Sequence, residues 1–174
     1  MKKLTTAEFS TQCINQASTK APISRVYRYG HPTETLLEGA DLAACILTEG
    51  RYLVFITHDS PTAKKLCIHL LDAELKPLDG ITMGLLMGYG PAYHFKGVRL
   101  YTHNQVSFQF LGPYIWTLQI YQQPKWRIPY LSDPFGTRRI QPGKLSCYLS
   151  ISRSRHTLIL NNQPRVQWLS LIHI

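Results

Sequence analysis

Acidic residues are scarce in the second half of this chain. The chain has 174 residues and a formal net charge of +9, with 19 Lys and Arg against 10 Asp and Glu. Residues 1–79 are balanced at nine basic and nine acidic residues, whereas residues 80–174 carry ten basic residues and one acid, Asp133. This asymmetry predicts an acidic partner or a nucleic acid for the second half.

Several further absences exclude whole classes of protein. None of the four cysteines lies in a C-x-x-C pair, so the sequence predicts no structural zinc site. No apolar run approaches the roughly 18–20 residues that a membrane span needs. Two N-terminal lysines are followed by no apolar segment, which predicts no secretory signal, a cytoplasmic location and no disulfides.

No motif identifies a reaction or a cofactor. The glycines between Gly80 and Gly97 form neither a P-loop nor a dinucleotide-binding fingerprint. His58, Asp59 and Ser60 are the residue types of a hydrolase triad. Three adjacent residues cannot converge on one point, so we interpret them as a turn. Cys67 and His69 share a predicted strand face, but no further ligand follows at metal-binding spacing, and we expect no metal and no cofactor.

Hydrophobic residues alternate along most of residues 42–121. Residues 51–58 are apolar on both faces, which predicts a central strand covered on both sides and paired to 42–48 through a tight turn at Glu49–Gly50. Residues 66–70, 106–110 and 116–120 follow a period of two. Placing Phe110 opposite Trp116 and Val98 opposite Phe110 brings apolar faces together. We expect Phe108, Phe110, Trp116 and Leu118 at the centre of the core.

These patterns predict a mostly β fold: an antiparallel meander that forms a sandwich or small barrel, with an α+β fold as the alternative. One short N-terminal helix is predicted over residues 5–17. Thr5 and Glu8 match a capping box, and Phe9, Cys13 and Ile14 recur at helical spacing. Residues 1–140 are predicted to form a single domain.

Residues 141–174 are predicted to be a tail with little structural role. The segment contains no acid, and its final "LSLIHI" resembles translated sequencing adaptor rather than an evolved terminus. A segment that did not evolve with its domain has no reason to match the surface of that domain. We therefore treat the tail as a candidate non-native addition.

Basic and aromatic residues mix in "QQPKWRIPYLSDPFGTRR" at 122–139. Nucleic-acid bases stack on aromatic rings while cations contact phosphates, so this composition fits nucleic-acid binding. The candidate contact residues are Lys125, Trp126, Arg127, Arg138 and Arg139. The alternative is a solvated, proline-rich strap whose aromatic side chains anchor it to the sheet.

Three functional classes follow from these features. The absence of a catalytic signature favours a non-enzymatic binding module for a protein partner, with an acidic partner as one form of it; an inhibitor- or immunity-type protein fits this class, although no motif supports it. The second class is a nucleic-acid-binding domain that uses the basic, aromatic region 96–139. The third is an enzyme whose site is assembled from dispersed residues such as His58, His94 and His103.

Overall fold

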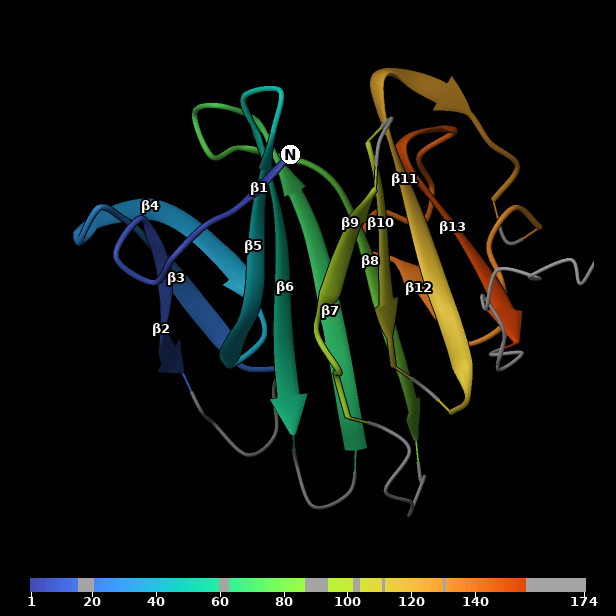
Figure 1. The fold of residues 1–174 in the computed structure, drawn as a ribbon, viewed down its shortest axis with the longest axis horizontal. Helices are drawn as coiled ribbons and strands as arrows, with labels where there is room; N and C mark the ends of the chain where they lie inside the picture. Colours follow the sequence, from blue (N-terminus) through green and yellow to red (C-terminus); the bar gives the residue numbers. More distant parts are fainter. Residues whose placement is uncertain are drawn as a thin grey trace, which may run out of the picture.

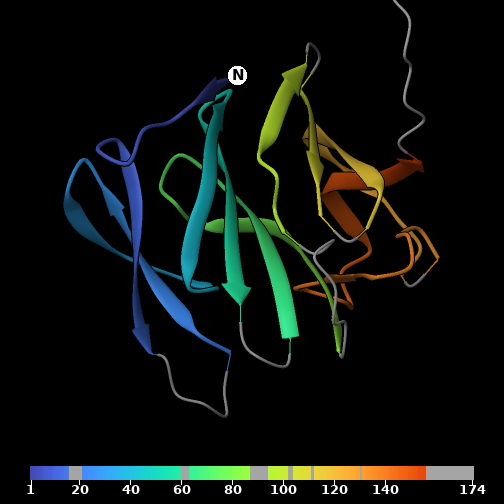
Figure 2. The same ribbon diagram turned by 60° about the horizontal axis from the view of Figure 1, so that its bottom comes forward.

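The fold consists of three stacked antiparallel β-sheets. The computed structural model describes residues 1–15, 21–59, 63–86, 94–101, 104–110, 112–129 and 131–155. A six-stranded sheet lies in the middle, with a three-stranded sheet on one side and a four-stranded sheet on the other (Figures 1 and 2). None of the three described sheets closes into a barrel. Of the two predicted arrangements, the sandwich is therefore closer to the observed fold.

The strands of each sheet follow in spatial order. The middle sheet runs β1 (Lys2–Lys3), β5 (Asp41–Thr48), β6 (Arg51–Asp59), β7 (Ala63–Leu71), β8 (Pro77–Leu86) and β12 (Thr137–Arg139). The four-stranded sheet runs β13 (Ser146–Arg155), β11 (Tyr114–Trp126), β10 (Gln105–Gln109) and β9 (Val98–Tyr101). The three-stranded sheet runs β2 (Phe9–Asn15), β3 (Ile23–Arg28) and β4 (His31–Glu38). These described segments contain no helix, and therefore none that could cross a membrane.

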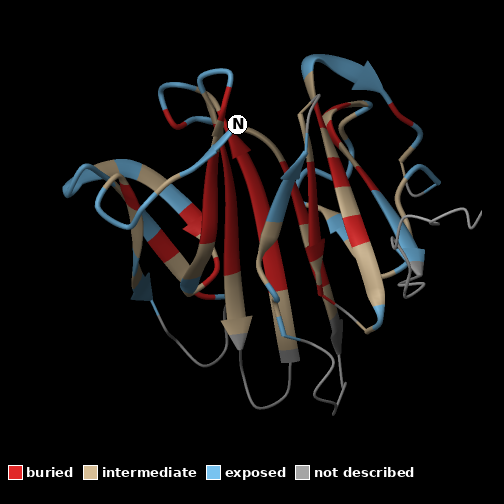
Figure 3. Ribbon diagram, viewed as in Figure 1, coloured by how far each residue is buried: buried red, intermediate tan, exposed pale blue. Residues whose placement is uncertain are grey.

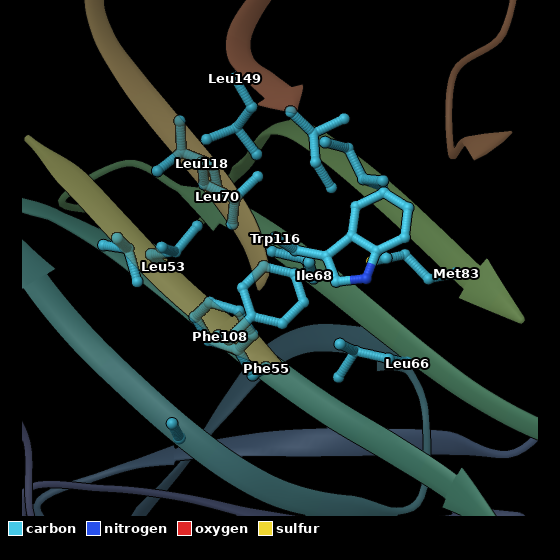
Figure 4. Packing of buried hydrophobic residues seen from close by; sticks show 14 of the residues in the cluster. Leu53, Phe55, Leu66, Ile68, Leu70, Met83, Phe108, Trp116, Leu118 and Leu149 are labelled. Carbon is cyan, nitrogen blue, oxygen red and sulfur yellow. The ribbon is translucent and has the colours of Figure 1, made fainter. Parts of the chain in front are cut away.

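Strand β6 is central and covered on both faces, which confirms the prediction for residues 51–58. Its Leu53 and Phe55 belong to the core between the middle and four-stranded sheets, which Figure 4 shows around Trp116 and Phe108. Its Val54 and Ile56 belong to a second core against the three-stranded sheet. All four side chains are fully buried. Two separate cores on one strand explain why its sequence is continuously apolar.

The hairpin between β5 and β6 also confirms its prediction. Thr48 pairs with Arg51, and the two residues between them have positive φ, 50° at Glu49 and 74° at Gly50. Two successive positive φ angles match the twist of a two-residue hairpin, and glycine adopts the second without a side-chain clash.

The predicted register of β9, β10 and β11 is wrong by two residues. Phe108, not Phe110, lies opposite Trp116, and Phe108, not Phe110, lies opposite Val98. A shift of two preserves which face each side chain occupies, so the core prediction holds: Phe108, Phe110, Trp116 and Leu118 are all buried. The indole N–H of Trp116 instead donates to the carbonyl oxygen of Phe110 over 2.6 Å.

The helix predicted for residues 5–17 is absent from the described residues 5–15. Thr5 and Glu8 make one of the two bonds of a capping box, in which the Thr5 N–H donates to Glu8 Oε2 over 2.9 Å. The Glu8 N–H donates to the Thr5 carbonyl oxygen rather than to its hydroxyl. The chain turns once there and continues as β2. Phe9 is buried with its ring stacked 5.6 Å from that of Tyr52, and β3 completes the hydrogen bonds of β2. Tertiary packing therefore overrides a local helix signal; residues 16 and 17 lie outside the described residues.

The segment after residue 140 packs with the domain as far as Arg155, which corrects the predicted tail for residues 146–155. Strand β13 pairs with β11 from Tyr114 to Trp126. Its Leu149 and Ile151 lie in the main core, while the alternating Ser150 and Ser152 are half-buried and exposed, respectively. This period of two is an ordinary strand signal. The predicted tail rested instead on the lack of acids in this segment, which does not affect strand formation. Residues 156–174, including the adaptor-like ending, lie outside the described residues.

Candidate functional site

The basic, aromatic segment begins where β11 bends out of the sheet. The pairing of β11 with β13 shifts between Ile120 and Lys125, and Pro124 within this bulge has no N–H to donate. The guanidinium of Arg51 donates to the carbonyl oxygens of Tyr121 over 2.8 Å and Gln122 over 2.6 Å. Arg51 thereby binds carbonyl groups of the bulge. Beyond the bulge the chain enters residues 126–145, which we call the strap.

A buried ionic cluster holds the strap in place. Arg139 Nη2 donates to Asp133 Oδ1 over 2.6 Å, and Arg127 Nη1 donates to Asp133 Oδ2 over 3.3 Å. The arginine side chains are 4% exposed and that of Asp133 is 10% exposed. Arg127 also donates to the carbonyl oxygens of Gln141 and Pro142, which ties the two ends of the strap together.

Asp79 joins this cluster to the sheets. Its Oδ2 accepts the backbone N–H groups of Tyr148 over 2.8 Å and Leu149 over 2.9 Å. The same oxygen lies 3.3 Å from Arg139 Nη1. Asp79 thus connects β8 and β12 of the middle sheet with β13 of the four-stranded sheet. Two aspartates and two arginines make the cluster electrically neutral, the condition under which charges are tolerated in an interior.

The five candidate nucleic-acid contacts divide into two groups. The side chains of Arg127 and Arg139 are each 4% exposed, and their N–H groups are used within the protein. Burial acts to lower the pKa of Arg139, but the hydrogen bond to Asp133 and the nearby aspartate charges raise that pKa above its usual value. Lys125, Trp126 and Arg138 are exposed. The structure therefore leaves three of the five side chains accessible to a partner.

The two described aromatic side chains of this segment, Trp126 and Phe135, face solvent instead of anchoring it. Trp126 is 73% exposed and Phe135 is 79% exposed. Six of the twelve large apolar side chains that are exposed in the described part of the chain lie between residues 126 and 145. Figure 3 shows this stretch mostly in the exposed colour, beyond the end of β11. We call its most exposed apolar members the strap surface: Trp126, Ile128, Leu131, Phe135 and Leu145.

Backbone contacts bring much of the strap surface together. Trp126 pairs with Ser146, next to Leu145, whose carbonyl oxygen accepts the N–H of Arg127 over 2.8 Å. The N–H of Ser132 donates to the carbonyl oxygen of Ile128 over 3.2 Å, which folds Leu131 back toward that strand end. Exposed large apolar side chains grouped on neighbouring backbone, as Trp126, Ile128, Leu131 and Leu145 are, are typical of interaction sites.

The histidines do not form a catalytic arrangement in the described residues. Both ring nitrogens of His94 lie 3.3 Å from Lys64 Nζ, a cation rather than the carboxylate that orients a catalytic base. His58 and Asp59 are strand residues of β6, paired with Lys65 and Lys64, so they do not form the predicted turn; Ser60 and His103 lie outside the described residues. The pocket beside β1 and β5, about 420 Å³, has no histidine or carboxylate among its described lining residues.

Cys67 and His69 share a face of β7, as expected, but lack the surroundings of a metal site. His69 Nε2 lies 3.0 Å from the carbonyl oxygen of Glu38 and donates to it. Burial raises the pKa of the Cys67 thiol to about 12, which disfavours the thiolate that metals bind. Over the ranges that the structure describes, no three His, Cys, Asp or Glu side chains gather in a metal-binding arrangement.

Asp79 and Asp133 are functional residues of the cluster that were not predicted from the sequence. A signal for Asp133 was present, because a single acid among ten basic residues is a natural partner for buried cations. Asp79 had no such signal, since its contacts with Tyr148 and Leu149 span 69 and 70 residues. No protein-family model, no curated protein and no solved structure matches this chain.

Proposed function

We propose that the protein is a non-enzymatic binding module that contacts a protein partner through the strap surface. The observation that carries the proposal is the concentration of exposed Trp126, Leu131 and Phe135 on one segment. Aromatic side chains dominate the energetics of protein interfaces, because each buries a large area at little entropic cost.

The way the strap is held supports this proposal. The cluster of Asp79, Arg127, Asp133 and Arg139 fixes the backbone under the exposed side chains. A binding surface that is rigid before association loses less conformational entropy on binding. Stability alone favours apolar side chains in the interior and charged side chains at the surface. The strap has the reverse arrangement, with an ionic cluster buried beneath exposed apolar residues. A partner that covers the strap surface would account for this arrangement.

Nucleic-acid binding is the second candidate. Trp126 is exposed next to Lys125, the pairing of ring and cation that stacks a base and meets a phosphate. Arg127 and Arg139 are engaged with aspartates, and Ile128, Leu131 and Leu145 offer nothing to a phosphate backbone. The protein-binding function therefore has the broader support.

The test is site-specific photo-crosslinking in an extract of the source cells. A benzophenone side chain at Phe135 should capture a defined protein, whereas one at Tyr29, exposed on the three-stranded sheet, should not. The crosslink should disappear in a Trp126→Ala/Leu131→Ser variant and persist in the matched Tyr29→Ala/Leu36→Ser control. Capture of nuclease-sensitive material from position 135 would favour the second candidate, and equal capture from both positions would contradict a dedicated surface.

A further inference from the structure

The strap contains no acid other than Asp133. Asp133 is the single acid of residues 80–174, and its carboxylate is buried between two arginines. The cluster thus removes from the exterior the one negative charge that this half of the chain has. Any charge that the strap presents to a partner is positive.

Two of the remaining cations lie close to members of the strap surface along the chain. Lys125 precedes Trp126 and lies with its Nζ 4.3 Å from the ring centroid of Tyr121. Arg138 follows Phe135 by three residues and is exposed. Among the ion pairs of the described residues, neither side chain meets a carboxylate. These two cations, which we call the cationic rim, are exposed charges beside the apolar residues along the chain, while Arg127 and Arg139 are neutralised by aspartates.

We infer that the partner of the strap surface is an acidic amphipathic protein segment, in which apolar side chains are flanked by carboxylates. This inference rests on the proposed function and specifies the chemistry of the partner. Apolar side chains of the partner would cover Trp126, Leu131 and Phe135, and its carboxylates would meet Lys125 and Arg138. Complementary rim charges accelerate association and exclude partners of the wrong sign.

The chemistry of the strap surface favours such a segment over a nucleic acid. A polyanion needs many cations and few aliphatic side chains at its contact, because phosphate contacts supply most of its affinity. Here the most exposed large apolar side chain is Leu131, at 81%. Of the four arginine and lysine residues between 125 and 139, Arg127 and Arg139 lie inward and are already paired with aspartates.

The experiment is a selection of displayed random peptides on the immobilised full-length protein. Peptides that bind the wild-type protein are tested again on Trp126→Ala/Leu131→Ser and on the control Tyr29→Ala/Leu36→Ser. Peptides that lose binding only on the first variant define strap-dependent ligands. We expect them to be rich in Asp and Glu interspersed with Leu, Phe or Trp.

Charge reversal gives the second measurement. A Lys125→Glu/Arg138→Glu variant should bind the selected peptides roughly three- to tenfold more weakly at low salt, the size expected for two exposed ion pairs. A matched Arg25→Glu/Lys76→Glu variant, which changes two exposed cations elsewhere, should bind as the wild type does. Circular dichroism of both variants checks that the β-sheet spectrum is retained.

The possible failures are distinguishable. Strap-dependent peptides that are neutral or basic would overturn the acidic partner and leave the proposed binding surface intact. Selection that gives no strap-dependent peptide would overturn the proposed function itself, and the inference with it. Equal losses in the two charge-reversal variants would show that only net charge matters, which contradicts a cationic rim at the strap.

Discussion

Arg139 and Asp133 form a nearly solvent-free ion pair, with Arg139 Nη2 2.6 Å from Asp133 Oδ1 and neither side chain more than 10% exposed. Within the strap, the pair links the short strand β12 to the loop that precedes it. It also explains why a segment rich in cations has so little free charge where it contacts the sheets.

Replacement of Asp133 by Asn should destabilise the protein strongly. The change keeps the shape of the side chain but leaves Arg127 and Arg139 with a single buried carboxylate, that of Asp79. Breaking a buried ion pair by removing one partner costs about 3–5 kcal/mol of unfolding free energy. Urea titration measures this loss, with the exposed Glu34→Gln as the control. A loss below about 1 kcal/mol would mean that solvent reaches the cluster.

Replacement of Phe108 by Ala should cost about 3–5 kcal/mol of unfolding free energy, the usual effect of deleting a buried ring. Phe108 is 3% exposed, and its ring packs edge-on against that of Phe55 with centroids 5.4 Å apart. Tyr101→Ala, at an exposed position of the adjacent strand β9, is the matched control and should change stability little. Equal effects of the two changes would contradict the assignment of the core face of β10.

Truncation after Ser150 should destabilise the protein, contrary to the expectation from sequence that residues 150–174 contribute little. It removes Ile151, a core residue, and the pairs that β13 makes with β11 from Tyr114 to Leu118. Burial of one such side chain contributes about 1.5–3 kcal/mol, and the lost strand adds to this. The comparison is between chains ending at Ser150 and at Arg155, by thermal unfolding. Equal melting temperatures would show that this end of β13 is dispensable.

Stability should fall as the pH drops below about 6.5, because of His69. Burial lowers the pKa of His69 in the folded protein, whereas the unfolded chain has the ordinary value. Below that ordinary value the unfolded state binds a proton that the folded state does not, so the stabilisation present at higher pH is lost with falling pH. The slope contributed by one such group is at most about 1.4 kcal/mol per pH unit.

A His69→Gln variant should show a flatter dependence of unfolding free energy on pH between 7.5 and 5 than the wild-type protein, as the slope from this one group disappears. His31→Gln, at an exposed position, should keep the wild-type slope. The reverse ranking of the two variants would place the titrating group elsewhere.

The sequence by itself determined the β class, the two-sided burial of β6 and the inward faces of β10 and β11. These properties depend on a period of two, which is local and is written in consecutive residues. The exact register needed more, because two registers that differ by two residues place the same side chains on the same face. The N-terminal helix failed for a related reason: Thr5 and Glu8 encode a local cap, but the packing of Phe9 against Tyr52 decided what followed it.

Only the tertiary structure decided which cations and rings of residues 125–139 reach solvent. A guanidinium can be buried only where carboxylates pair with it. The carboxylates that pair with Arg139, those of Asp79 and Asp133, come from different parts of the chain. The side chains that the strap buries are those of the ionic cluster, whereas Trp126 and Phe135 lie exposed. Composition states which residues are present in a segment, but the side that each one faces depends on partners that are brought together by folding.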